Sequence, residues 1–217
     1  MKITAISTQM RNANRVNISI DGSYRFSLDI FQVVDSRLKI GHELSDEELA
    51  ALETESVFGK VYAQALEYVM LRPHSAREIR DYLWRKTRST HYRSRKTGEM
   101  KQREGISTSV AARVFDRLQD KGYVDDERFA QWWIENRNLR KGSSQRKLQS
   151  ELRAKSVDGQ TIDRILQESN RTDSEELTKI IAKKQHKYPD RKKFTQYLMR
   201  QGFRYDDICA ALETTEA

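Results

Sequence analysis

The sequence is poor in cysteine, proline and glycine. Its 217 residues include one cysteine, two prolines and nine glycines. A single cysteine, Cys209, excludes a disulfide framework, and we expect it to be a small core residue of a protein in a reducing compartment. Because proline and glycine are the residues that interrupt helices most, their scarcity leaves room for long helices.

The sequence also lacks residues at the spacings typical of catalytic and metal sites. Four histidines, at positions 42, 74, 91 and 186, lie in separate segments without the spacing of zinc ligands. No glycine-rich loop follows a strand to hold a phosphate group. Acidic pairs such as Asp206–Asp207 stand at expected helix starts, where capping accounts for them. We therefore expect no enzyme activity, no catalytic residues, no metal and no cofactor.

Long apolar runs are absent as well. No segment is long enough to span a bilayer, and residues 1–9 lack the apolar stretch of a signal peptide. We expect a soluble, cytoplasmic protein that has no membrane partner.

Charge is abundant and unevenly distributed. Charged residues make up 33% of the chain, and its net charge is +8. Residues 1–59 carry six Lys or Arg and nine Asp or Glu, so the rest of the chain has a net charge of +11. A basic body behind a mildly acidic leader predicts a polyanionic partner, either nucleic acid or an acidic protein surface.

The leader has the alternating pattern of β-strands. Apolar residues alternate with polar ones over residues 16–20 and again over 24–28, which predicts a hairpin. We expect a three-residue loop, 21–23, because a one-residue slip would move every side chain to the other face. The pairs expected from this register are Ile20–Tyr24, Ile18–Phe26 and Val16–Leu28.

Other elements of the leader follow from shorter signals. Residues 3–8 are expected to add a third strand, and residues 29–37 a short helix. Ser45 followed by Glu48 is a capping-box pattern, which predicts that another helix begins there.

From about residue 57 the pattern is helical and repeats three times. The stretches beginning at Ser75, Ser144 and Asp190 each start with a capping residue and then place apolar residues four positions apart. Opening helices are expected before them, at 57–71, 126–138 and 173–187. Each unit is too small to bury its apolar face alone, so stacking of neighbours must supply the core.

The fold class expected is therefore mainly α. Three tandem three-helix repeats form an elongated, curved body, preceded by a small N-terminal β-hairpin and helix subdomain. The expected divisions are 1–55 for the N-terminal subdomain, 56–124 for the first repeat, 125–169 for the second repeat and 170–217 for the third repeat.

The first repeat contains a basic insertion at 88–106. Six of its residues are Lys or Arg, among them Lys96, and it has no apolar period. Such a composition is typical of a disordered, solvated loop. A flexible basic arm that contacts phosphates when a partner arrives is the alternative.

The repeats also carry a basic residue at one equivalent position. Arg77, Arg146 and Lys192 each precede a core residue by two positions, which turns them about 200° away from the core on a helix. Stacked repeats would convert such a residue into a continuous stripe; solubilising surface charge is the alternative. The residues proposed to bind a partner are Arg77, Arg80, Arg137, Arg140, Lys141, Arg146, Lys147, Lys192, Lys193 and Arg200.

The segment 122–137 joins two expected helices. Gly122 ends the first helix, and Asp125 is a good N-cap for the second. Capping and contact with a partner are both open roles for Asp125 and Asp126. The aromatic face that follows is expected to pack in the core: Phe129, Trp132 and Trp133.

Two blocks of sequence resemble the RecX family, small bacterial modulators of the RecA recombinase. Residues 122–130, with Trp133 and Arg137, resemble the central signature of that family. Residues 194–203 resemble its C-terminal block, although Gln201 stands where the family has arginine. The resemblance implies three tandem three-helix repeats in a DNA-repair and homologous-recombination protein of the SOS response.

The resemblance also implies a partner and an activity. The partner is the RecA filament on single-stranded DNA, and double-stranded DNA is an open second partner; the protein itself is expected to be a monomer. The activity is modulation, usually inhibition, of ATP hydrolysis and strand exchange by RecA.

A helix-turn-helix transcriptional regulator is the alternative from a different class. Residues 143–147 would then present base-reading side chains at the start of a helix. Recurrence of the same helix type three times argues against this reading. Sequence-dependent binding to duplex DNA would distinguish it from binding to recombinase filaments.

Overall fold

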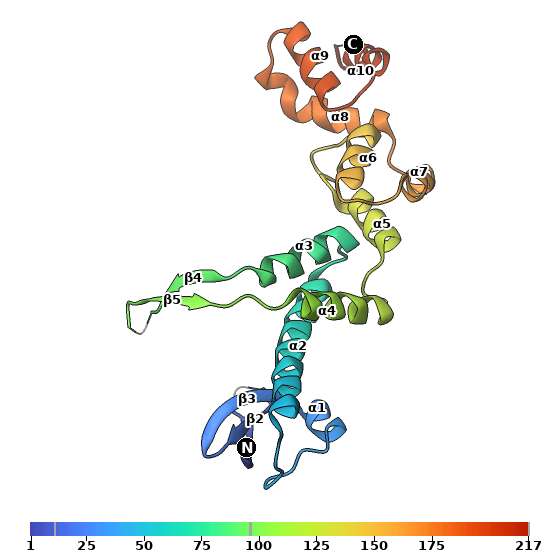
Figure 1. Ribbon diagram of the computed structural model, residues 1–217. Coiled ribbons are helices and arrows are strands. Elements are labelled where there is room, and N and C mark those ends of the chain that lie inside the picture. The colour runs from blue at the N-terminus through green and yellow to red at the C-terminus, as the bar shows by residue number, and fades with distance from the viewer. Residues whose placement is uncertain (11, 96, 217) are drawn as a thin grey trace. The chain divides into compact units, whose positions relative to one another are not determined.

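The computed structural model describes residues 1–10, 12–95 and 97–216, which pack as two compact units. The first unit comprises Met1–Arg72 and Ile79–Tyr123, and the second comprises Pro73–Glu78 and Val124–Ala217. Helices predominate in both (Figure 1). The mainly α fold predicted from the sequence is therefore confirmed, whereas the elongated, curved arrangement of the repeats stays a prediction.

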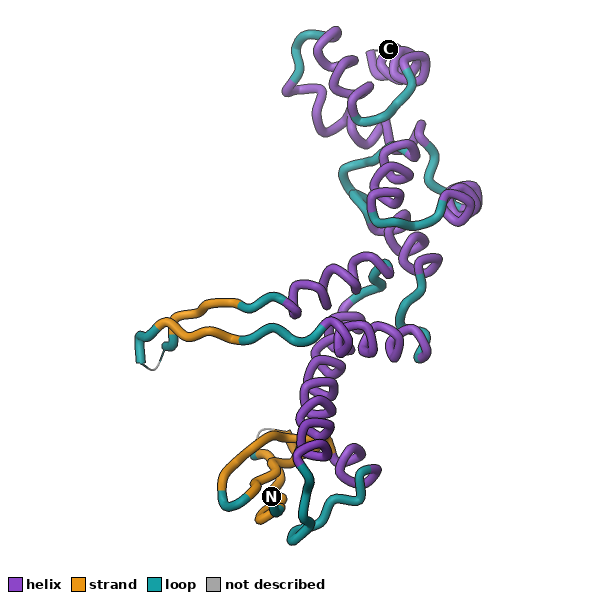
Figure 2. Tube along the Cα trace, in the orientation of Figure 1, coloured by secondary structure: helices purple, strands orange, loops and turns teal. Residues whose placement is uncertain are grey.

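The first unit begins with a three-stranded antiparallel sheet, which Figure 2 shows in orange. Its strands are β1 (Ile3–Gln9), β2 (Asn12–Ile20) and β3 (Ser23–Asp29), in the order β1-β2-β3. Apolar side chains of one face are buried: Ile3, Val16, Ile18, Ile20, Phe26 and Leu28. The predicted third strand is thus confirmed, and the alternation in the sequence correctly marks the buried face.

The register of the β2–β3 hairpin is only partly as predicted. Ile18 lies opposite Phe26, as expected, but Ile20 lies opposite Ser23, so the loop has two residues and not three. Both loop residues have positive φ, 49° at Asp21 and 83° at Gly22. A β-bulge next to Ile18 shifts the register by one residue and restores the face of Phe26. The prediction missed this bulge because alternation alone does not reveal an extra residue.

Two helices cover this sheet. The short α1 (Ile30–Asp35) is followed by α2 (Asp46–Leu71), which begins with the predicted capping box. The buried Ser56 hydroxyl donates to the carbonyl of Ser27 on β3 at 2.7 Å. The expected boundary between residues 55 and 56 falls inside α2, and the division of the chain into four domains stays a prediction.

The rest of the first unit contains α3 (Ala76–Thr87), whose first turn belongs to the second unit, and α4 (Thr108–Asp120). Between them lie two strands, β4 (Thr90–Arg93) and β5 (Met100–Arg103), which pair antiparallel. The expectation of helices alone beyond residue 57 is therefore wrong here, and the insertion folds as a hairpin. Lys96, one of its predicted basic residues, lies outside the described residues.

The second unit contains two three-helix repeats. Its first three helices are α5 (Asp126–Asn136), α6 (Gln145–Ala154) and α7 (Gly159–Glu168). The next repeat consists of α8 (Asp173–Lys184), the 3-10 turn η1 (Gln185–Lys187), α9 (Arg191–Arg200) and α10 (Tyr205–Glu216). Each repeat has its own apolar cluster, so the helical periodicity in the sequence is confirmed.

The joint at residues 122–137 has the predicted local structure. Gly122 has φ +73°, and the Asp125 carboxylate accepts a hydrogen bond from the Arg128 amide at 2.9 Å. Phe129 is fully buried, and Trp133 packs half-buried against it with ring centroids 5.5 Å apart. The indole N–H of Trp133 donates to Glu151 at 3.0 Å, which ties α5 to α6.

We expect Trp133→Ala to lower the free energy of unfolding by about 2–3 kcal/mol, because a half-buried ring loses less than the 3–5 kcal/mol of a fully buried one. Trp133→Phe keeps a smaller ring and loses the bond to Glu151, so its loss should be smaller, about 1–2 kcal/mol. Thermal unfolding followed by circular dichroism measures both. A melting temperature unchanged in Trp133→Ala would show that this ring does not hold the repeat together.

Candidate functional site

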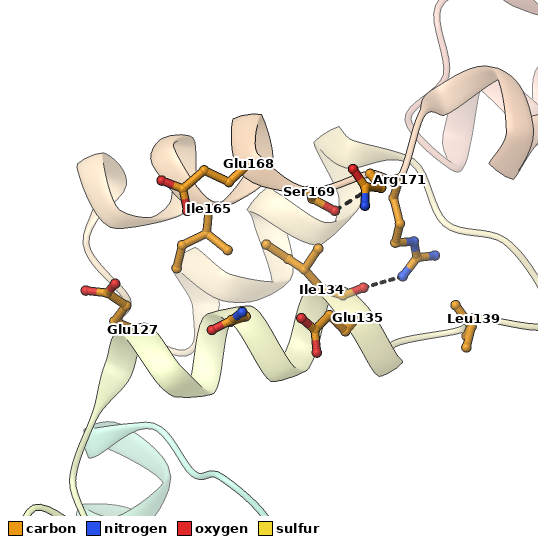
Figure 3. A pocket seen from close by; sticks show the side chains of 10 residues that line it. Glu127, Ile134, Glu135, Leu139, Ile165, Glu168, Ser169 and Arg171 are labelled. Carbon is orange, nitrogen blue, oxygen red and sulfur yellow. Dashed lines mark hydrogen bonds between the residues drawn. The ribbon is translucent and has the colours of Figure 1, made fainter.

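A hollow of about 290 Å³ lies between α5, α7 and the connection to α8 (Figure 3). Its wall is apolar at Ile134, Ile165 and Leu139. Three carboxylates line it as well: Glu127, Glu135 and Glu168. Negative charge of this kind repels phosphate groups, so the hollow does not suit the polyanionic partner that the net charge predicts.

Arg171 lies at one end of this hollow but is occupied within the protein. Its guanidinium donates to the carbonyls of Ile134 and Arg137 at the C-terminal end of α5, the latter at 2.8 Å. It also donates to the carboxylate of Glu176. Arg171 is 9% exposed and Glu176 is 1% exposed. The pair therefore completes the last turn of α5 and is structural.

Glu176 connects this pair to the start of α6. Its carboxylate accepts hydrogen bonds from the Ser143 amide at 2.8 Å and the Lys179 ammonium at 2.7 Å. Burial alone would raise the pKa of Glu176, but the hydrogen bonds from Arg171, Lys179 and Ser143 outweigh it. The pKa of Glu176 is therefore held below its ordinary value of 4.5.

A second set of polar contacts joins the two repeats of the second unit. The Gln145 amide, the first of α6, donates to the carboxylate of Asp173, the first residue of α8, at 2.7 Å. The Ser144 hydroxyl donates to the Gln201 carbonyl at 2.6 Å, and the Lys147 ammonium donates to the Gln201 side chain at 2.6 Å. Gly202 has φ +98°, and a Cβ there would lie 2.5 Å from the Ser144 hydroxyl.

The same contacts recur at the start of α3. The Ala76 amide donates to the carboxylate of Asp126, the first residue of α5, at 2.7 Å. Lys155 and Glu78 form an ion pair at 2.7 Å in the place that Gln201 and Lys147 occupy one repeat later. Asp126 thus accepts from the start of α3, whereas the capping interpretation places its role at the start of its own helix, where Asp125 is the N-cap.

The repeat position singled out in the sequence has a constant place in the structure. Arg77, Arg146 and Lys192 are each the second residue of their helices α3, α6 and α9, and all three are exposed. We call these three residues the basic ladder. Arg77 reaches Ser156 of the next repeat, with a distance of 3.4 Å from guanidinium to hydroxyl. The structure confirms that the positions are equivalent, whereas a role in binding stays a prediction.

The other predicted binding residues differ in exposure and in the contacts that their side chains make within the protein. Arg140, Lys141, Lys193 and Arg200 are exposed, and Arg200 makes a bond of 3.3 Å back to the Gln196 carbonyl. In the first unit, the exposed Arg80 lies over the ring of Phe115, with 4.3 Å from its guanidinium carbon to the ring centroid.

Two predicted binding residues have structural partners. Arg137 donates two hydrogen bonds to Glu151, at 2.9 and 3.1 Å, and lies over the ring of Trp133. The half-buried Lys147 is held by Gln201. Hydrogen bonding to Glu151 raises the pKa of Arg137, so its charge is permanent but locally neutralised. Both side chains are thus engaged within the protein, and their role in binding stays a prediction.

The sequence prediction missed the Arg171–Glu176 pair. Arg171 lies just before α8 and Glu176 lies in its first turn, among other charged residues. No periodic pattern in the sequence distinguishes these two buried charges from the solvent-exposed charges around them. The Asp126–Asp173 correspondence did leave a signal, because each aspartate directly follows the N-cap of its opening helix. An alignment of the opening helices α5 and α8 would have shown that Asp126 and Asp173 are equivalent.

Over residues 1–10, 12–95 and 97–216, no group of three or more His, Cys, Asp or Glu side chains could hold a metal ion. None of the helices in those ranges is both long and apolar enough to cross a bilayer.

Comparisons with known proteins give one consistent family. Residues 1–45 match the family model described as "Regulatory protein RecX N-terminal domain", and residues 125–166 match "RecX, second three-helix domain". The chain is 32% identical to regulatory protein RecX of Bacillus subtilis (strain 168), over 99% of this chain and 77% of that protein. It is 27% identical to regulatory protein RecX of Clostridium tetani, over 97% of this chain and 93% of that protein.

A solved structure shows the same fold. It is described as "Crystal structure of regulatory protein RecX" and aligns with a TM-score of 0.68 at 21% identity, over 98% of both chains.

We expect Arg171→Met to lower the free energy of unfolding by about 3–5 kcal/mol, because it leaves the Glu176 carboxylate buried without its main partner. Replacing both residues, Arg171→Met with Glu176→Met, should recover much of that loss, since no buried charge remains. Urea unfolding measures both, with Arg153→Met, an exposed arginine on α6, as the control near zero. A loss below about 1 kcal/mol for Arg171→Met would contradict the buried pair.

Glu176 should also make stability depend on pH. Because its pKa is lowered in the folded state, its contribution is present above its ordinary pKa of 4.5 and is lost as pH falls through the folded value. The difference in unfolding free energy between the wild type and Glu176→Gln should therefore shrink below about pH 4.5. A difference that stays constant down to pH 3 would show that folding does not lower the pKa of Glu176.

Proposed function

Because the chain belongs to the RecX family of regulatory proteins, we propose that it binds the filament that RecA forms on single-stranded DNA. Binding modulates, chiefly by inhibition, the ATP hydrolysis and strand exchange of that filament. The protein acts as a non-enzymatic cytoplasmic regulator of DNA repair, as a monomer and without a cofactor.

The basic ladder is the observation that carries this proposal. Arg77, Arg146 and Lys192 occupy one equivalent exposed position in three successive repeats. A filament repeats its own subunits and the phosphates of its DNA along one axis. A repeated cation suits such a partner better than a single cluster does, because each repeat offers the same contact.

Helix electrostatics add a second argument. The first turn of an α-helix is the positive end of its dipole, so a cation there costs roughly 0.3–1 kcal/mol. The first turn of α6 contains Arg146 and Lys147, and that of α9 contains Arg191, Lys192 and Lys193, with no acidic residue in either. The carboxylates of Asp173 and Asp190 already accept from the first amides of these helices, so the exposed cation side chains, and not the free helix ends, would attract phosphates and carboxylates.

Neighbouring exposed cations extend the proposed surface. Arg140 and Lys141 precede α6, and Lys193 and Arg200 lie on α9. Their proposed partners are acidic patches on RecA, the phosphates of single-stranded DNA and, more weakly, double-stranded DNA. Arg80 belongs to the first unit and is proposed as a separate contact with the same partners.

The start of α6 argues against a base-reading role. Within residues 143–147 only Arg146 is exposed. Ser144 and Lys147 are bonded to Gln201, and the Gln145 side chain donates to the Arg171 carbonyl at 2.9 Å. A helix whose polar side chains are used inside the protein cannot present them to base edges, so we do not favour a transcription factor.

The decisive experiment is a titration of the full-length protein into RecA hydrolysing ATP on single-stranded DNA. We expect hydrolysis to fall as the protein approaches a stoichiometric ratio to RecA, because the regulator occupies the filament. Unchanged hydrolysis, together with no co-sedimentation with filaments, would contradict the proposal.

The ladder is tested by reversing its three charges in one variant, Arg77→Glu, Arg146→Glu and Lys192→Glu. We expect weaker filament binding and a shallower dependence on salt, because fewer ion contacts remain to be lost as salt rises. Helicity should be kept, since glutamate in the first turn suits the helix dipole. The matched control reverses three other exposed cations, Arg128→Glu, Arg153→Glu and Lys187→Glu, and changes the net charge equally. If both variants lose the same affinity for the filament, the basic ladder contributes no more than other surface charges do.

A further inference from the structure

The β4–β5 hairpin is an ordered element whose strands are fully exposed. All eight residues of its two strands are exposed, and the strands pair only with each other. Its tip is closed by backbone bonds of 2.8 Å between Ser94 and both Glu99 and Gly98, and Gly98 has φ +70°. A ribbon of two strands is marginal in water unless something packs on it, so these exposed faces are suited to receiving a partner.

Its register sorts the side chains onto two faces. Tyr92 lies opposite Lys101, and Thr90 lies opposite Arg103, so these four side chains share one face. The Arg103 guanidinium carbon is 5.5 Å from the centroid of the Tyr92 ring. This face therefore presents an exposed aromatic ring beside two cations.

The base of the hairpin has a second exposed aromatic ring next to an arginine. Trp84 on α3 is 57% exposed, and the Arg88 guanidinium carbon lies 5.0 Å from its ring centroid. Trp84 also borders an open hollow of about 440 Å³ between α3 and α4, with Leu83, Ala111 and Phe115. Figure 1 shows the hairpin extending from the end of α3 and the start of α4.

Charge indicates the class of partner. Residues 88–104 contain six Lys or Arg and two Glu. One of the two, Glu104, is bonded to Ser89 at 3.2 Å and to Gln102 at 2.7 Å. The occupant must therefore be an anion, and the exposed rings require that it also present flat apolar faces. Single-stranded nucleic acid meets both requirements, whereas duplex bases are stacked away and acidic protein surfaces lack such faces.

We propose that the β4–β5 hairpin and Trp84 form a binding site for single-stranded nucleic acid. Tyr92 and Trp84 stack on bases, while Arg88, Lys101 and Arg103 contact the phosphates. Single-stranded DNA is already a partner in the proposed function; the hairpin adds a separate site for it that uses base stacking, requires no recombinase and can be tested without RecA.

The test uses the full-length protein and a short fluorescein-labelled oligothymidine, with binding followed by fluorescence anisotropy. Tyr92→Ala should weaken binding roughly five- to 150-fold, the range of one lost base stack. Tyr92→Phe should bind as the wild type does, because the ring is kept. Tyr24→Ala is the matched control, since Tyr24 is 58% exposed and lies on a strand of the other hairpin.

A second oligomer separates stacking from charge. On an abasic strand with the same number of phosphates, the wild type and Tyr92→Ala should bind equally. The charge variant Lys101→Glu with Arg103→Glu should weaken binding to both oligomers. Two lost phosphate contacts should make the slope of log affinity against log salt shallower by about 1.4.

Several results would overturn the proposal. One is that the wild type does not bind oligothymidine. Another is that Tyr92→Ala binds oligothymidine as tightly as the wild type does. A third is that Tyr92→Ala loses as much affinity for the abasic strand as for oligothymidine. Hairpin variants that bind oligothymidine normally but lose RecA filaments would identify a protein-docking element instead. The oligonucleotide assay contains no RecA. A negative result there would therefore contradict the hairpin site alone, and the proposed inhibition of ATP hydrolysis is tested separately by the RecA titration.

Discussion

The second unit depends on helix ends that are completed by groups from neighbouring helices. An α-helix leaves its first amides and last carbonyls without partners, and a short helix has few internal bonds to compensate. Asp126 and Asp173 serve the first amides of α3 and α6, while Arg171 serves the last carbonyls of α5. The helices are about ten residues long, so they need these contacts as much as they need their apolar clusters.

That constraint also determines which charges remain for a partner. Arg171, Glu176 and Lys147 are held inside the unit, and Arg137 is neutralised by Glu151. The ladder residues lie on the second position of each middle helix, where the side chain points outward from the same helix start. Structural and binding roles thus fall on adjacent residues, and a single substitution such as Lys147→Glu would disturb both, whereas Arg146→Glu disturbs only the surface.

Some of this could be predicted from local patterns and some could not. Alternation and capping residues predicted the sheet, the start of α2 and the joint at Asp125, because each depends on residues within one or two turns. The loop of the β2–β3 hairpin was predicted wrongly, since a bulge absorbs the odd residue that alternation would place in the turn. The insertion was expected to be irregular because its composition cannot form a core, yet Gly98 and the paired strands fold it without one.

The sequence by itself determined the helical repeats, the N-terminal sheet, the excess of positive charge and the equivalence of Arg77, Arg146 and Lys192. These follow from periodicity and spacing, which are properties of neighbouring residues. Only the tertiary structure decided that Asp126 caps α3, that Arg171 and Glu176 are buried together, and that Tyr92 shares a face with Lys101 and Arg103. Those facts depend on which distant backbone groups and strand positions come into contact, and pairing across the chain leaves no period in the sequence.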